Sequence, residues 1–168
     1  MTFKERFRDL QELVRELVLI REHNLQFKED DSQKTLLLFA EASLCLIVLE
    51  RFLRILPSVK ATERDTLFNL LGRATSSKVG VLHFVDLNSG RPVLDEQRRQ
   101  RIIHEIKDVR NTLQHGNYEQ AARQSGCSTT VEYFNKFFAS EIEELYKITD
   151  SLMKQIDADT GEPWQQSK

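Results

Sequence analysis

Residues 36–56 are apolar on almost every side of a helix, and this stretch limits the fold more than any other part of the sequence. Glu41 interrupts the longest apolar run. The uninterrupted part is shorter than the roughly 20 apolar residues that a bilayer span needs, which excludes a membrane anchor. We therefore expect a central helix that begins at a cap on Asp31 or Ser32, ends before Pro57, and is covered by other helices on several sides.

The rest of the chain is expected to form further helices, because apolar residues recur at spacings of three and four and only six Gly and three Pro are present to make turns. The helices are predicted at residues 2–28, 31–56, 62–73, 95–114, 118–124 and 128–156. Thr62 and Asp65 resemble a capping box for the third helix. Residues 74–94 are either a short strand or an ordered loop. The prediction is an all-α fold, an up-down bundle of four to five helices plus a short helix, with one domain at 1–157 and a flexible tail at 158–168.

Composition excludes several broad classes of protein. The formal net charge of -2 excludes a protein that binds nucleic acid through bulk positive charge, although a local site remains open. The first ten residues mix both charge signs and lack the basic start and apolar middle of a signal peptide, so we expect a cytoplasmic protein. Two cysteines, Cys45 and Cys127, cannot form a disulfide framework, and both are expected to be buried as small hydrophobes.

The most informative stretch is D-V-R-N-T-L-Q-H-G-N-Y, residues 108–118. On a helical wheel at about 100° per residue, four aliphatic residues take the side that faces the core. These are Ile102, Ile106, Val109 and Leu113. Four groups capable of hydrogen bonding line the opposite side, namely His104, Asp108, Asn111 and His115. Arg110 lies at the border between the two sides, and Gly116 follows where a helix C-terminus favours a left-handed residue.

Arg110, Asn111 and His115 are the kinds of group that transesterification at an RNA phosphate needs. His115 can move a proton of the 2′-hydroxyl or of the leaving oxygen. Arg110 carries a planar, permanently charged fork that grips two phosphate oxygens and offsets charge on the phosphorane. Asn111 adds a neutral donor and acceptor. This scheme requires no metal or cofactor, and its alternative is an ordinary solvated helix end.

The run R-N-T-L-Q-H, Arg110 to His115, resembles the signature of the HEPN superfamily, an Arg followed by four to six residues and then His. The late position of this helix in a small helical chain with an apolar central helix is also similar to that superfamily. The resemblance implies a metal-independent endoribonuclease, a toxin or defence effector, whose two protomers bring their motifs together at a homodimer cleft. Arg110 would hold the scissile phosphate of RNA, His115 would act as acid or base, and Asn111 would orient one of them.

The resemblance leaves alternatives open. One subgroup of these toxins pairs with a nucleotidyltransferase antitoxin and carries R-x4-H-x-Y, whereas Tyr118 stands one position later than that pattern. Tyr118 is expected either to pack or to touch RNA, and Arg101 and His104 are the other residues expected to contact the substrate. The superfamily also contains members that bind nucleotides or scaffold complexes without cleaving RNA, so a non-catalytic interaction module is the alternative function.

Charged residues elsewhere also allow two explanations each. Glu41 is expected either to pair with Arg110 or to reach water through a gap between helices.

The stretch His104–Asp108 comes close to the zinc-protease pattern H-E-x-x-H, but Asp replaces the second His, so we expect no metal site. Six basic residues between positions 91 and 110 form either a rim that attracts phosphate or a solvated face with charge pairs. These are Arg91, Arg98, Arg99, Arg101, Lys107 and Arg110.

Overall fold

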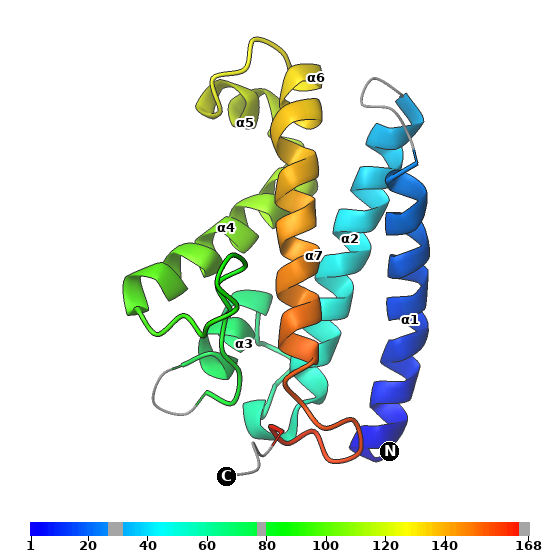
Figure 1. The fold of residues 1–168 in the computed structure, drawn as a ribbon, viewed down its shortest axis with the longest axis vertical. Coiled ribbons are helices and arrows are strands. Elements are labelled where there is room, and N and C mark those ends of the chain that lie inside the picture. Colours follow the sequence, from blue (N-terminus) through cyan, green and yellow to red (C-terminus); the bar gives the residue numbers. More distant parts are fainter. Residues whose placement is uncertain (27–31, 77–79, 165–168) are drawn as a thin grey trace.

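The structure, a computed structural model, describes residues 1–26, 32–76 and 80–164, and only the helical backbone of residues 32–34. Four long helices alternate in direction (Figure 1), namely α1 (Phe3–Asn24), α2 (Ser32–Ile55), α4 (Glu96–His115) and α7 (Ala139–Met153). The shorter elements are the 3-10 turn η1 (Pro57–Val59), α3 (Leu67–Ala74), α5 (Tyr118–Gln124), α6 (Thr130–Tyr133) and the π-helical turn η2 (Phe134–Phe138). The predicted all-α up-down bundle is confirmed, whereas the cap expected on Asp31 or Ser32 concerns side chains outside the described residues.

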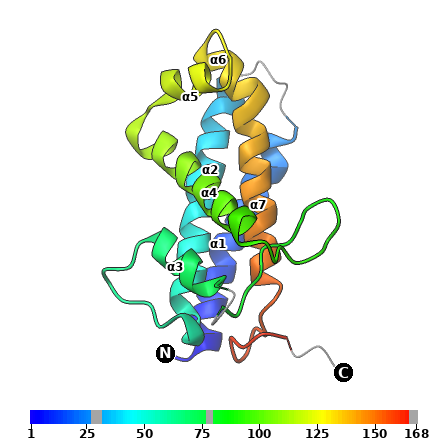
Figure 2. The same ribbon diagram turned by 90° about the vertical axis from the view of Figure 1, so that its left-hand side faces the viewer.

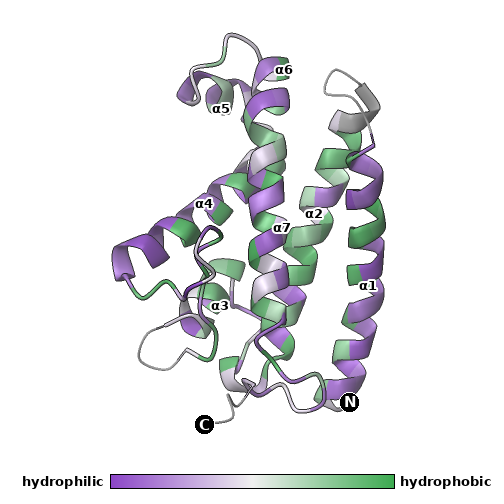
Figure 3. Cartoon of the chain, in the orientation of Figure 1, coloured by the Kyte–Doolittle hydropathy of each residue, from purple (hydrophilic) through white to green (hydrophobic). Residues whose placement is uncertain are grey.

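Helix α2 is the central helix, as its apolar composition predicts. It packs against α1, α7, α3 and α4, and Figure 3 shows apolar residues along most of its length while α1 and α4 are largely polar. Four of its large side chains have no exposed surface, namely Val48, Leu49, Phe52 and Leu53. Each contributes about 1.5–3 kcal/mol by leaving water. Cys45 and Cys127 are buried, as expected, and no helix in the described ranges is both long and apolar enough to cross a membrane.

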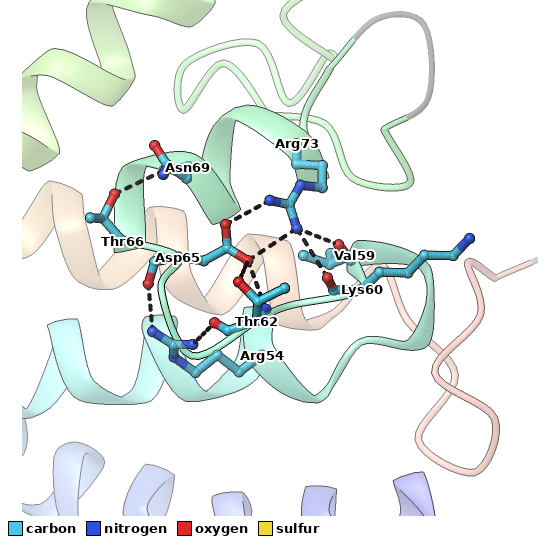
Figure 4. A network of polar contacts seen from close by, with 8 residues as sticks. All are labelled: Arg54, Val59, Lys60, Thr62, Asp65, Thr66, Asn69 and Arg73. Atoms are coloured by element: carbon cyan, nitrogen blue, oxygen red, sulfur yellow. Dashed lines mark hydrogen bonds and ion pairs between the residues drawn. The ribbon is translucent and has the colours of Figure 1, made fainter.

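Helix α3 begins five residues later than predicted. The Asp65 carboxylate accepts hydrogen bonds from the Thr62 amide and hydroxyl at 2.7 and 3.0 Å, as a capping box would, but these bonds close a turn. Arg54 donates to the backbone carbonyls of Thr62 and Asp65, and Arg73 binds the Asp65 carboxylate from the other side (Figure 4). The two arginines therefore fix residues 62–66 as an extended turn in front of α3, and the prediction of helix there is wrong.

The segment between α3 and α4 is an ordered loop over its described residues 80–95, which decides between the two alternatives. A single antiparallel bridge joins Val85 to Pro92. Three apolar side chains of the loop are buried, namely Leu82, Phe84 and Val93. The Gln155 side chain, after α7, accepts from the His83 amide at 2.8 Å and donates to the His83 carbonyl at 2.7 Å. The loop is thus held by burial and by one side-chain amide rather than by a strand.

The long helix predicted at residues 128–156 is interrupted. Thr129 caps its start, accepting from the Glu132 amide at 3.1 Å. After one turn of α6, the backbone widens into the π-helical turn η2 before α7 continues. Such a turn adds a residue to the helix and shifts the face that follows, which an apolar spacing pattern alone does not reveal.

Residues 157–164, which include the first part of the predicted flexible tail, form a turn that folds back onto the start of α1. The Asp157 amide donates to the Glu162 carbonyl at 2.9 Å, and the Trp164 amide donates to Gln155 at 3.0 Å. Asp159 forms an ion pair with Lys4 at 2.9 Å. Polar composition suggested a frayed end, but backbone bonds in this turn do not depend on apolar side chains. Residues 165–168 of the predicted tail lie outside the described residues.

Candidate functional site

The candidate site lies along α4, which crosses in front of α2 and α7 (Figure 2). Asp95 caps the start of the helix, and Gly116 ends it with a φ of 62°. The buried residues are Ile103, Ile106 and Val109, while Ile102 and Leu113 are only partly buried. The predicted core side was therefore correct in direction but omitted Ile103.

Arg110 lies half-buried toward α3. Its guanidinium carbon is 5.6 Å from the centroid of the Phe68 ring, a cation–π contact. Among the described residues Arg110 makes no hydrogen bond and no ion pair. Its donors are thus not used by any described residue and are available to a ligand.

Glu41, which we expected to meet Arg110 or water, does neither. Its side chain is 2% exposed, and its carboxylate accepts from Arg21 at 3.1 Å and from the Asn24 amide at 2.7 Å. Both donors come from α1, whereas Arg110 lies on α4. These two helices lie on different sides of α2 (Figure 1). This pairing follows from the way α1 and α2 pack, which the spacing of residues within α2 could not indicate.

Asn111 and His115 lie on the outward side of α4. Asn111 is half-buried and lines a hollow of about 270 Å³ between α4 and α5, together with Asp108, Thr112, Asn117, Gln120, Ala121 and Gln124. His115 is exposed and is the last residue of the helix. At about 100° and 1.5 Å per residue, the Cα atoms of Arg110 and His115 are about 140° apart around the axis and about 7.5 Å apart along it. Within one chain, α4 therefore does not direct the side chains of Arg110 and His115 toward the same point.

Tyr118 is the first residue of α5 and belongs to an aromatic cluster. Its ring lies 5.3 Å from the Phe39 ring and 5.1 Å from the Phe134 ring, measured between centroids. The side chain is half-buried, and burial raises the pKa of its hydroxyl. Of the two uses expected for Tyr118, the structure shows packing.

Arg101 and His104, the other predicted substrate contacts, are exposed on α4 and make no hydrogen bond with a described residue. Two arginines of the basic patch are already paired with carboxylates. Arg98 pairs with Asp86, and Arg99 pairs with Glu96 at 2.6 Å. The patch is thus partly a set of charge pairs, and its remaining cations are Arg91, Arg101, Lys107 and Arg110.

An acidic groove of about 270 Å³ between α4 and α7 was not anticipated from the sequence. Its floor is apolar, and four carboxylates line it, namely Glu105, Asp108, Glu141 and Glu144. Burial raises the pKa values of Glu105 and Glu141, and the neighbouring Glu144 carboxylate adds to both shifts. The Tyr133 hydroxyl donates to Glu141 at 2.8 Å. The carboxylates on this side of α4 repel a polyanion. In the sequence, the only sign of the groove is the i, i+3 spacing of Glu105 with Asp108 and of Glu141 with Glu144.

In residues 1–26, 32–76 and 80–164, no group of three or more His, Cys, Asp or Glu side chains is arranged to hold a metal ion. Comparison of the chain with models of known protein families, with characterised proteins and with solved structures found no match. The residues of the site and their geometry are therefore the observations that bear on function.

Proposed function

We propose that the chain is a metal-independent endoribonuclease, a toxin or defence effector that acts in the cytoplasm as a homodimer. The observation that supports this most directly is Arg110, a guanidinium without a carboxylate partner among the described residues, on the helix that ends in the exposed His115. An unpaired cation and an exposed imidazole, once brought together, suit a phosphate that reacts by proton transfer. The resemblance of R-N-T-L-Q-H to the HEPN signature points to the same chemistry.

The reaction is a transesterification. His115 removes the proton from the 2′-hydroxyl, the 2′-oxygen bonds to phosphorus, and the bond from phosphorus to the 5′-oxygen breaks. The leaving 5′-oxygen takes up a proton from an imidazolium, which leaves a 2′,3′-cyclic phosphate and a 5′-hydroxyl. Arg110 donates to the phosphate oxygens as their charge grows, and Asn111 orients the phosphate or the imidazole.

The site is shared between two copies in this proposal. Arg110 and His115 leave α4 in directions about 140° apart, so a second motif helix is needed to bring an imidazole to the phosphate that Arg110 holds. A homodimer supplies that helix twice, once for each of two equivalent sites.

The test is cleavage of a fluorescently labelled RNA by purified protein in EDTA, with the ends of the products identified by mass spectrometry. We expect cyclic-phosphate ends for the wild type and no cleavage for Arg110→Ala or His115→Ala. His83→Ala is the matched control, because His83 is also exposed but lies in the loop before α4. Cleavage that survives in the His115→Ala variant would refute the role of this residue.

Mixing the two inactive variants tests whether the site is shared. In a dimer with one Arg110→Ala chain and one His115→Ala chain, one of the two sites keeps both groups. Random exchange of subunits should therefore restore about a quarter of the wild-type activity. No recovery in a mixture proven to contain mixed dimers would show that each site lies within one chain.

A non-catalytic interaction or nucleotide-binding module is the second candidate. It is favoured by the packing of Tyr118 and by the separation of Arg110 and His115 within one chain. It predicts a stable complex without RNA cleavage and no growth defect on overexpression. Co-expression with a cognate nucleotidyltransferase antitoxin would relieve a growth defect only if the toxin proposal holds.

A further inference from the structure

The side of α4 that faces α3 holds two cations against one aromatic ring. The Lys107 ammonium is 5.9 Å and the Arg110 guanidinium 5.6 Å from the centroid of the Phe68 ring. Lys107 is exposed, and Arg110 and Phe68 are half-buried. Neither cation has a hydrogen bond or ion pair with a described residue. A cation held by a ring keeps its full charge and its donors, whereas a carboxylate partner would neutralise it.

This arrangement differs from that of the neighbouring arginines. Four arginines around α3 and α4 pair with carboxylates: Arg54 with Glu50, Arg73 with Asp65, Arg98 with Asp86 and Arg99 with Glu96. Two like charges one helical turn apart repel each other unless an anion joins them. Lys107 and Arg110 have no such carboxylate among the described residues, so both cations are available to an external anion.

The position of the ring is fixed by the surrounding contacts. Arg73 anchors α3 to the turn before it (Figure 4), donating to the Val59 carbonyl at 2.8 Å and to the Asp65 carboxylate at 2.7 Å. Arg99 joins α4 to α3, donating to the Gly72 carbonyl at 3.3 Å. These contacts hold α3 and α4 together, so Phe68 keeps Lys107 and Arg110 in place. Less conformational entropy is then lost when the two cations bind a ligand.

We propose that Lys107 and Arg110, held over Phe68, bind the phosphodiester backbone of single-stranded RNA on the α3–α4 side of the protein. This inference rests on the proposed ribonuclease function and adds the path that the substrate takes. The opposite side of α4 is closed to a polyanion because Glu105, Asp108 and the two glutamates of α7 line the groove there. Proteins that grip duplex RNA by its shape span about 16 base pairs, whereas this cationic surface covers one helical turn and fits a short single strand.

The test is binding of a labelled 12-nucleotide single-stranded RNA in EDTA, measured by fluorescence anisotropy over a series of salt concentrations. All variants carry His115→Ala so that cleavage does not disturb the titration. We expect Lys107→Gln to weaken binding about three- to tenfold at low salt, because one charge-assisted contact is lost. The slope of log Kd against log salt should fall by about 0.7, the value for one phosphate contact on a single strand.

Phe68 is a positioning residue and needs its own variants. Phe68→Leu should weaken binding although the net charge is unchanged, and Phe68→Tyr, which keeps the ring, should bind like the parent. Lys147→Gln is the matched control, since Lys147 lies on α7 in an ion pair with Glu143 at 2.8 Å, and it should change Kd less than twofold. Thermal unfolding followed by circular dichroism identifies any variant that fails to fold.

Three results would overturn the inference: no binding by the parent, an unchanged Kd and salt slope for Lys107→Gln, or tighter binding of a duplex of equal length. Failure of the ribonuclease proposal looks different. If the wild type cleaves no RNA but Lys107→Gln and Phe68→Leu still weaken binding, the proposed RNA-binding surface holds and the ribonuclease proposal fails. If the wild type cleaves RNA, Lys107→Gln and Phe68→Leu bind normally in the His115→Ala background, and the same two substitutions made with His115 intact cleave normally, the nuclease proposal holds and the RNA-binding surface does not.

Discussion

Replacing Glu41 by Ala should destabilise the fold more than any other single change at a polar side chain that we consider. The Glu41 side chain is 2% exposed, and Arg21, which donates to it at 3.1 Å, is 16% exposed. The Arg21 guanidinium also lies 4.3 Å above the centroid of the Tyr146 ring on α7. Glu41 is thus the buried carboxylate that balances a cation lying between three helices, and it also accepts from the Asn24 amide at 2.7 Å.

The size of the loss follows from what the substitution leaves behind. Removal of one partner from a buried ion pair costs about 3–5 kcal/mol, because the other charge stays buried without compensation. Asn24 would lose its acceptor in addition, and its own Oδ1 already has no hydrogen-bond partner within the described ranges. Arg21 keeps some contact with water and keeps the half-exposed Glu143 carboxylate at 3.7 Å. We therefore expect a loss of about 3 kcal/mol in the free energy of unfolding, which lowers the melting temperature by about 6–12 °C in a domain of this size.

Urea unfolding followed by circular dichroism at constant m-value measures this loss. Glu143→Ala is the control, because Glu143 faces the same Arg21 at 3.7 Å but is 48% exposed, and it should cost less than about 1 kcal/mol. The double variant Arg21→Met with Glu41→Leu should come within about 1 kcal/mol of the wild type, since both charges are gone. A loss below about 1 kcal/mol for Glu41→Ala would refute a buried pair at this position.

Two further predictions concern the ends of the bundle. Arg73 is the main cause that lowers the pKa of Asp65 to about 2 from 3.8, so this carboxylate contributes stability above pH 3.8 that disappears as the pH falls toward 2. Urea midpoints for Asp65→Asn should therefore be lower at pH 7 and change less between pH 4 and pH 2 than those of the wild type. Gly161→Ala should lower the melting temperature more than Gly126→Ala. Both glycines have positive φ, but only at Gly161 would a Cβ lie 2.8 Å from the Phe3 ring.

Most of the helices could be predicted from the sequence because their apolar residues follow the period of a helix. α1, α2 and α5 fall within the predicted ranges, and α4 ends one residue beyond its range, at His115. Each of these helices has an apolar face or is apolar on all sides. The start of α3 and the turn η2 could not be predicted in this way. The first depends on polar contacts of Arg54 and Arg73, which lie on the helices before and after the turn that they hold. The second is a change of backbone register.

The candidate site was predictable to the same limited extent. The helix period places His104, Asn111 and His115 on the outward side of α4, and all three lie there. The contacts of Arg110 with Phe68 and of Tyr118 with Phe39 join segments far apart in the chain. Such contacts depend on how α2, α3, α4 and α5 pack against one another, so they cannot be predicted from a motif within one helix.

The packing of α4 also restricts how two chains could share a phosphate. Its basic residues Lys107 and Arg110 face α3, while Glu105 and Asp108 face α7. In the proposed dimer, an RNA strand held by Arg110 would therefore approach from the α3 side, and the partner's His115 would have to reach the phosphate from that side as well. A dimer formed through the acidic groove would instead bring eight carboxylates, four from each chain, to one interface. Such an interface would oppose a polyanion, because like charges that lose contact with water repel strongly. A functional dimer should thus leave the α4–α7 groove outside the contact.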